Sequence, residues 1–433
     1  MSGSRPPAPS GAPLLGQTVA FVRDPLGMYG DVAAECGDVA RLWVLGLGEF
    51  YALTHPDHVE RVLTTDRDAF AKTRDFRVAL GESVVSTEGE RWRRQREALE
   101  EFFYPARVRS YADRMVDLTE RRLDRWTPGE RLSLHEEMSG AALDNLFGTV
   151  FDRPLDPDGD ERLRRAANGV NLWFRPSSFA LPEWVPTPSR RRFRASRATL
   201  EREARRLLRE AREGGGDDLL STLAALQERE ETDLTDDEIV DQVVGLTFAG
   251  HDTTALVLTY ALHHLGTHEA ARERFHAELD AVLDGRPTLD DAGDLEVTRR
   301  ILHETMRLYP PVHTVPRETT RPVEFDGYRL EPGTRTHLAV WQVHRDARFW
   351  DDPESWRPSR WRDASPASKG GAFVPFGAGP RTCLGRRFAL LEGTLVLASV
   401  GRRFVLDPAG PLSFDPMVTT QPADGVPVRV RSR

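Results

Sequence analysis

The sequence predicts a mainly helical protein with small β-sheets near its two ends. Long segments mix charged and apolar residues at helical spacing, as in residues 190–213 and 268–284. Strand-like pieces are short and lie towards the start and in the last third of the chain. We find no internal repeat and no clear linker, so we expect one domain over residues 1–433, with residues 1–12 as a flexible lead-in rich in Pro, Ser and Gly.

The individual elements follow from local patterns. Clusters of turn-forming residues predict loops at 181–188, which is rich in proline, and at 214–216, which is all glycine. Alternating or β-branched runs predict strands in three groups. These groups are 38–44 with 49–54, then 322–330 with 336–343 after Pro310, and finally the FVLD and VPVRVRS segments that close the chain.

The clearest single element is a helix over residues 235–266. Thr235 and Glu238 have the spacing of a capping box at its start, and Gly266 is a plausible stop. Apolar residues cover most of its circumference, which indicates a helix that runs through the core. Its middle contains AGHDTT, although a buried Asp252 requires a hydrogen-bonding partner. This polar interruption indicates either a solvated kink or a functional segment.

Composition excludes several classes of protein. The formal net charge of −9 argues against a nucleic-acid binder, and there is no apolar run of about 18 residues to span a membrane. The start of the chain lacks a secretory pattern, and two cysteines do not form a disulfide framework, so we expect a cytoplasmic protein without a membrane anchor. Lys72 and Lys369 are the only lysines.

Cys383 lies in the unusual segment FGAGPRTCLGRR, residues 376–387. Its glycines allow tight turns and close approach to a flat partner, and residues from Leu384 onward have helical spacing. Unpaired N–H groups at a helix start favour a thiolate. A thiolate with an apolar wall from Phe376 and a cation from Arg381 suits a macrocyclic metal cofactor that carries carboxylates. A zinc site lacks further ligands, and no Cys-His protease signature surrounds this cysteine.

These residues resemble a known family. FGAGPRTCLG matches every defined position of F-G-x-G-x-R-x-C-x-G, the heme-binding pattern of the cytochrome P450 superfamily. Further motifs follow the order of that family and extend the resemblance from about residue 12 to the end. They are WRRQR at 92–96, AGHDTT at 249–254, ETMR at 304–307 and WRPSRW at 356–361. The resemblance implies a cytochrome P450 fold, with the long central helix over the heme.

The resemblance also implies a cofactor and its contacts. Heme b would be held by Cys383 as the thiolate ligand of the iron, an arrangement that favours O–O cleavage. Arginines are well matched to the heme propionates. The residues expected to bind the cofactor are Trp92, Arg96, Ala249, Gly250, Arg317, Phe376, Gly377, Arg381, Cys383 and Gly385.

By the same resemblance, Asp252 and Thr253 are the catalytic pair that delivers protons during oxygen activation. The Thr253 hydroxyl can bond the carbonyl four residues back or a water. Thr254 is expected to be structural, and His251 is expected to be a hydrogen-bonded helix histidine rather than a proton carrier. Glu304, Arg307 and Arg360 are expected to form a structural triad, although Trp361 departs from the usual phenylalanine.

The expected activity is a soluble monooxygenase that inserts one atom of dioxygen into an apolar organic substrate, such as a fatty acid, terpenoid, carotenoid or steroid-like molecule. Electrons would come from a separate ferredoxin or flavodoxin-type partner, because the chain contains no fused flavin reductase. Arg91, Arg93 and Arg94, with Arg386 and Arg387, could form a basic docking patch, or they could be scattered solvated charges. A monomer is expected.

Two other functions remain open from sequence. The first is a peroxide-driven peroxygenase or heme-thiolate isomerase, against which the Asp252–Thr253 pair argues. The second is a non-catalytic heme binder or gas sensor, against which the lack of an accompanying sensory module argues.

Overall fold

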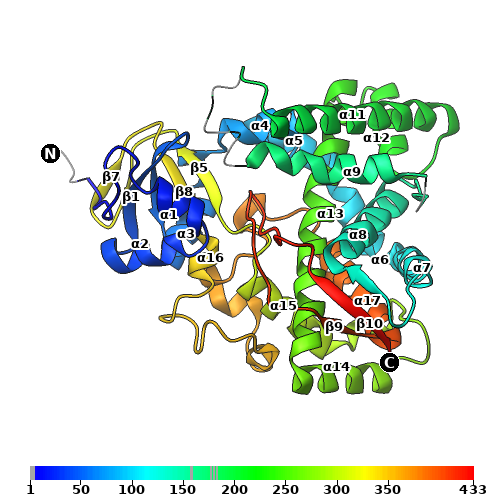
Figure 1. Cartoon of the computed structure of the whole chain (residues 1–433). Helices are drawn as coiled ribbons and strands as arrows, with labels where there is room; N and C mark the ends of the chain where they lie inside the picture. Colours follow the sequence, from blue (N-terminus) through cyan, green and yellow to red (C-terminus); the bar gives the residue numbers. More distant parts are fainter. Residues whose placement is uncertain (1–4, 157–158, 176–177, 179–180, 182–183) are drawn as a thin grey trace.

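The structure is a computed structural model that describes residues 5–156, 159–175, 178, 181 and 184–433. A part built on a β-sheet lies to one side, and helices form most of the rest, with α13 running through their middle and β9 and β10 lying among them (Figure 1). This confirms the predicted class, mainly α with small β-sheets. Residues 1–4 of the expected lead-in, and 182–183 of the expected loop, lie outside the described residues.

The largest sheet has five strands in the order β1-β2-β8-β5-β3. Strand β2 pairs parallel to β8, and the other neighbours are antiparallel. The described part of the lead-in is fastened to this sheet, since the Arg41 N–H donates to the Pro7 carbonyl at 2.8 Å. The strands are β1 (Val39–Val44), β2 (Gly48–Leu53), β3 (Phe70–Ala71), β5 (Val315–Thr319) and β8 (Arg335–Leu338).

Two strand predictions need correction. The segment 336–343 is a strand only as far as Leu338, and α16 (Val340–Val343) follows. Val340 and Val343 are three residues apart and both buried, so one helical turn places them on the same core face. The segment 322–330 is a hairpin of β6 (Val323–Phe325) and β7 (Tyr328–Leu330), split at Asp326-Gly327, where both residues have positive φ.

A third, small sheet closes the chain. Strand β10 (Pro427–Ser432) lies between β4 (Arg131–Ser133) and β9 (Phe404–Pro408), antiparallel to both.

Helix α13 (Asp236–Thr267) has the predicted capping box between Thr235 and Glu238. The helix ends at Thr267, one residue after the stop predicted at Gly266. A Cβ at that position would lie 2.5 Å from the Leu406 carbonyl oxygen, so Gly266 allows β9 to pack closely.

The remaining helices surround α13 or cover the sheet, and most of the apolar core lies between α13 and its neighbours. Those of the helical part are α5 (Gly89–Glu100), α6 (Pro105–Ser110), α7 (Ala112–Leu123), α8 (Leu134–Val150), α9 (Glu161–Gly169), α11 (Pro188–Gly214), α12 (Leu219–Glu228), α14 (Glu269–Val282), α15 (Glu296–Leu308) and α17 (Arg386–Arg403). Nearer the sheet are α1 (Thr18–Arg23), α2 (Met28–Cys36) and α3 (Pro56–Leu63), while α4 (Arg74–Leu80) lies beside α5 (Figure 1).

Candidate active site

A mainly apolar cavity of about 350 Å³ lies among α5, α13, the loop before α5 and the cysteine loop before α17. It brings together the predicted cofactor residues except Arg317, and it includes Thr253 but not Asp252. The predicted residues that line it are Trp92, Arg96, Ala249, Gly250, Thr253, Phe376, Gly377, Arg381, Cys383 and Gly385.

The cysteine loop is shaped by two of its three glycines. Gly377 and Gly379 have φ of 68° and 67°, a region that other residues rarely adopt. A Cβ on Gly379 would also lie 2.4 Å from the Leu63 carbonyl oxygen. Gly385 has an ordinary φ of −82°, so the expectation that it too is needed for a tight turn is wrong. The Cys383 N–H donates to the Phe376 carbonyl at 2.8 Å, which closes the loop.

Cys383 lies three residues before α17 and on the wall of the cavity. Protein surrounds the side chain, which remains accessible through that cavity. Burial raises the pKa of the Cys383 thiol, while the Gly385 N–H, Arg96 and Arg386 act in the opposite direction. The N–H near the helix start therefore favours the thiolate, as the sequence predicts, but desolvation is the larger effect. A bound metal cation is the partner that would favour the thiolate here.

Arg96 and Arg381 extend into the cavity from α5 and the cysteine loop. The Arg96 guanidinium donates to the Thr382 carbonyl at 2.9 Å and to Glu100 at 2.8 Å. Arg381 lies 4.4 Å from the centre of the Trp92 ring and pairs with Glu88. Burial lowers its pKa. Its Nη1 is buried and has no hydrogen-bond partner within the described part of the chain, so this cavity holds an unsatisfied cationic donor.

Sequence reasoning missed Lys72, which also lines this cavity. Its ammonium group donates to the Val85 carbonyl. Burial strongly lowers the pKa of Lys72, and the positive charges of Arg317 and Arg381 lower it further. Arg317 of β5 is half-buried and does not line the cavity, and desolvation lowers its pKa to about 10. The signal available in the sequence was that Lys72 is one of only two lysines among 59 basic residues.

The two members of the predicted catalytic pair point in different directions. The Thr253 hydroxyl lines the cavity and donates to the Ala249 carbonyl at 2.8 Å, as its helical position predicts. The Asp252 side chain is buried away from the cavity, where the Gln421 amide donates to its two oxygens at 2.8 and 3.0 Å. Gln421 lies 169 residues along the chain, and no local pattern could have revealed it.

The other residues of the AGHDTT segment have structural contacts. His251 is buried, with its ring nitrogens 2.5 Å from the Thr247 carbonyl and 2.9 Å from Asn168, as expected for a hydrogen-bonded helix histidine. Gly250 packs against α8, since a Cβ there would lie 3.3 Å from Leu146. Thr254 lines the cavity beside buried Glu392.

Glu304 is the centre of the expected triad and lies outside the cavity. Its carboxylate accepts from Arg307 at 2.9 and 3.1 Å and from Arg360 at 2.9 Å, all within the protein interior. The indole N–H of Trp361 also donates to Glu304 at 2.9 Å. The departure from phenylalanine at this position therefore supplies an extra donor to a buried charge.

Fewer of the five arginines in the predicted basic patch keep an uncompensated charge than the sequence suggested. Arg91 and Arg94 of α5 form ion pairs with Glu82, Asp233 and Glu238, so their charges are largely compensated. Arg93 forms only a surface pair with Glu90. Among the described residues, no ion pair involves Arg386 or Arg387, which are exposed at the start of α17.

A second cavity of about 400 Å³ lies between the sheet and α4. It shares Phe76 and Val418 with the first cavity, so the two are neighbours. Apolar residues of α1, including Phe21 and Val22, form part of its wall.

None of the helices in the described ranges is long and apolar enough to cross a membrane.

A helical fold with a cysteine and several cations around one apolar cavity defines a heme-thiolate type of protein. The chain belongs to the cytochrome P450 family, whose profile matches residues 6–425. It is 34% identical over 415 residues to cyclooctat-9-en-7-ol 5-monooxygenase of Streptomyces melanosporofaciens, covering 93% of this chain and 89% of that protein. It is 33% identical to pentalenene oxygenase of Streptomyces avermitilis, covering 91% and 89%.

A solved structure supports the same assignment. The crystal structure of the cytochrome P450DA heme domain aligns with a TM-score of 0.88 at 25% identity, covering 100% of this chain and 98% of that one. The expected P450 fold and monooxygenase class are confirmed. Members of this family use heme b with a cysteine thiolate as the axial ligand, and they act on organic substrates with dioxygen and redox partners.

Proposed function

We propose that this P450 inserts one oxygen atom from dioxygen into an apolar, terpenoid-like substrate in the 350 Å³ cavity. The observation that carries the proposal is that Cys383 and Thr253, from motifs 130 residues apart, line this one cavity. Apolar walls favour an apolar ligand. The names of the two Streptomyces relatives, a cyclooctat-9-en-7-ol monooxygenase and a pentalenene oxygenase, support the terpenoid class.

The cavity fits heme b. Cys383 would bind the iron, and the positive-φ glycines of its loop leave room for a flat ring, with open space where a Cβ on Gly377 would lie. Arg381, with its unpaired buried Nη1, would bind a propionate, and Lys72 and Arg96 would contribute charge. A propionate would also relieve the unfavourable burial of these cations. Heme, when bound, supplies the iron at which dioxygen is activated.

The protein's own contribution to oxygen activation would come from α13. The Thr253 hydroxyl can hold its bond to Ala249 or turn to donate into the cavity, which places one exchangeable proton at Oγ1. Asp252 would take part in proton delivery from a position buried away from the cavity, where the Gln421 amide holds its carboxylate in place. This arrangement supports a dioxygen-dependent monooxygenase over a peroxide-driven enzyme, which has no need of proton delivery.

Electrons would come from a separate acidic ferredoxin or flavodoxin-type protein. Arg386 and Arg387 are the exposed cations closest in sequence to Cys383, and their charges are available for a partner. We therefore place docking at the start of α17 rather than on Arg91 and Arg94 of α5, which are occupied by internal ion pairs.

The proposed function is tested by supplying dioxygen with a reductant and a surrogate redox partner, and separately hydrogen peroxide alone. A library of terpenes and terpene alcohols would be screened by optical shifts of the heme-loaded enzyme, and binders would be assayed for oxygenated products. A monooxygenase forms product with dioxygen and reductant. Product from peroxide alone would support the peroxygenase, and heme binding without any product would support the non-catalytic alternative.

A further inference from the structure

The loop of residues 82–87, between α4 and α5, forms part of the cavity wall through Val84 and Val85. Loops without regular secondary structure usually lie on surfaces and move more than the elements they connect. This loop differs because its Ser83 is fully buried against α13. A Cβ at Gly245 of α13 would lie 2.7 Å from the Ser83 Cβ, so only a glycine allows the loop to pack this closely.

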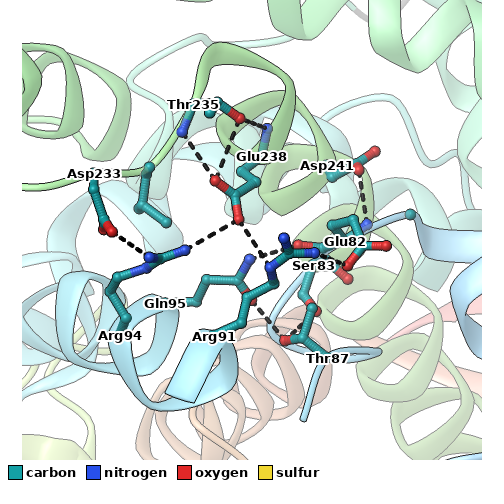
Figure 2. Close-up of polar contacts among 12 residues, drawn as sticks. Glu82, Ser83, Thr87, Arg91, Arg94, Gln95, Asp233, Thr235, Glu238 and Asp241 are labelled. Atoms are coloured by element: carbon teal, nitrogen blue, oxygen red, sulfur yellow. Dashed lines mark hydrogen bonds and ion pairs between the residues drawn. The ribbon is translucent and has the colours of Figure 1, made fainter. Parts of the chain in front are cut away.

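Two buried amides bind the loop from opposite neighbours, Gln242 from α13 and Gln95 from α5; Figure 2 shows Gln95 beside Glu82 and Thr87. Gln242 of α13 accepts from the Val84 N–H at 2.8 Å and donates to the Glu82 carbonyl at 3.3 Å. Gln95 of α5 donates to the same Glu82 carbonyl at 2.6 Å and accepts from the Thr87 hydroxyl at 2.6 Å. Both glutamines are 0% exposed. Without them, backbone groups of the loop would be buried without partners, which is strongly disfavoured.

An outer layer of charges covers these amides (Figure 2). Arg91 pairs with Glu82 and lies 3.5 Å from Glu238, and Arg94 pairs with Asp233 and lies 3.4 Å from Glu238. The two arginine side chains are 44% and 37% exposed, so salt and water weaken these pairs. The buried amides are therefore the stronger part of the attachment.

The loop also reaches the predicted propionate-binding arginine. The Thr87 carbonyl accepts from the Arg381 guanidinium at 2.9 Å, and Gln95 holds the same threonine through its hydroxyl. One attachment thus fixes both the apolar wall at Val84 and Val85 and a cation of the cofactor site.

We propose that Gln242 and Gln95 form an amide clamp that holds residues 82–87 as a fixed cavity wall, and that this clamp determines which ligand shapes the cavity accepts. They are positioning residues, since neither lines the cavity. The part of this inference that concerns ligand shape rests on the proposed function, because it treats the part of the cavity beside Val84 and Val85 as the space left for a ligand when heme is bound.

The test uses the heme-loaded enzyme and the variants Gln242→Leu and Gln95→Leu. Hydrogen exchange of peptides that contain residues 82–87 measures how firmly the loop is held, and it needs no ligand. Losing the amide bonds should accelerate that exchange by about tenfold or more. Imidazole and 4-phenylimidazole serve as optical probes of the heme iron. In the clamp variants, the ratio of the two dissociation constants should differ from that of the parent by about fivefold or more. The dissociation constant of imidazole itself should stay within about twofold of the parent value.

Gln17→Leu is the matched control. Gln17 is also a buried glutamine with two backbone bonds, from its amide to Pro9 at 3.0 Å and from Trp43 at 2.8 Å, but it lines neither cavity. It should leave loop exchange and the azole ratio unchanged. Unchanged exchange in both clamp variants would overturn the clamp, and faster exchange with an unchanged ratio would overturn its role in ligand shape. Failure of every azole to shift the spectrum would instead refute the heme site.

Discussion

Replacing Trp361 with phenylalanine tests the account of the buried carboxylate at Glu304. The substitution keeps an aromatic ring in contact with Phe373, whose ring centre lies 4.6 Å away, but it removes the indole N–H that donates to Glu304 at 2.9 Å. A hydrogen bond to a buried charged group contributes about 1.5–3 kcal/mol. Glu304 keeps its bonds from Arg307 and Arg360, so we expect the missing bond to cost that amount, in addition to the loss of ring area, without collapse of the fold.

Trp350→Phe provides a matched control for the loss of ring area. Trp350 is equally buried, 2% against 4% exposed for Trp361, and its indole nitrogen has no hydrogen-bond partner within the described residues. Urea unfolding of the heme-loaded variants, followed by far-ultraviolet circular dichroism, measures both losses. The Trp361 variant should lose about 1.5–3 kcal/mol more than the Trp350 variant. Equal losses would refute the claim that the indole N–H stabilises the buried charge.

Three further predictions follow from the site. Thr253→Ala should uncouple the enzyme, so that more reductant is consumed than product is formed and peroxide accumulates. Thr253→Ser should retain coupling. Unchanged coupling in the alanine variant would exclude a role of Thr253 in proton delivery. Burial raises the pKa of Glu392 from 4.5 to about 8, so the folded state holds a proton that the unfolded chain loses, and stability falls as pH rises from about 4.5 to 8. Glu392→Gln should therefore be more stable than the parent at pH 8, by on the order of 4 kcal/mol, but not at pH 4, as pH-dependent unfolding would show. Changing Arg386 and Arg387 to glutamate should slow reduction by an acidic ferredoxin at low salt and much less at high salt, while the same change at residues 191–192 should not.

The parts of the fold and site that could be predicted from sequence are those specified by neighbouring residues. The capping box needs only Thr235 and Glu238, and the cysteine loop is closed by a bond between Phe376 and Cys383, seven positions apart. The Glu304–Arg307 pair lies on one helical turn. Each of these is a short pattern with one physical solution, so its geometry follows once the pattern is recognised.

Residues that meet only after folding could not be predicted in the same way. Gln421 reaches Asp252 and Gln242 reaches Val84 from about 160 positions away, and neither the helical position of Gln242 nor the loop position of Gln421 indicates its partner. Burial likewise raises the thiol pKa of Cys383, an effect that its position before a helix start does not reveal. The basic charge of Arg91 was visible in sequence, but the acids that compensate it were not.

The predicted strands lie in the right places but not always with the right extent, and β3, β4 and β5 were not predicted at all. The mostly apolar segment Ala-Val-Trp-Gln-Val follows Leu338 with no turn residue between them, and only its packing shows that Val340 and Val343 face the core from one helical turn. Such a run fits a strand or a helix equally well by periodicity.

The central claim is that Cys383 holds the heme as a thiolate ligand. The measurement that tests it most directly is the absorption spectrum of the reduced carbon monoxide complex, for the parent and for Cys383→Ala loaded with heme. The parent should show the far red-shifted Soret band of thiolate ligation, and the alanine variant should lose it. A variant that binds heme and keeps that band would contradict the account.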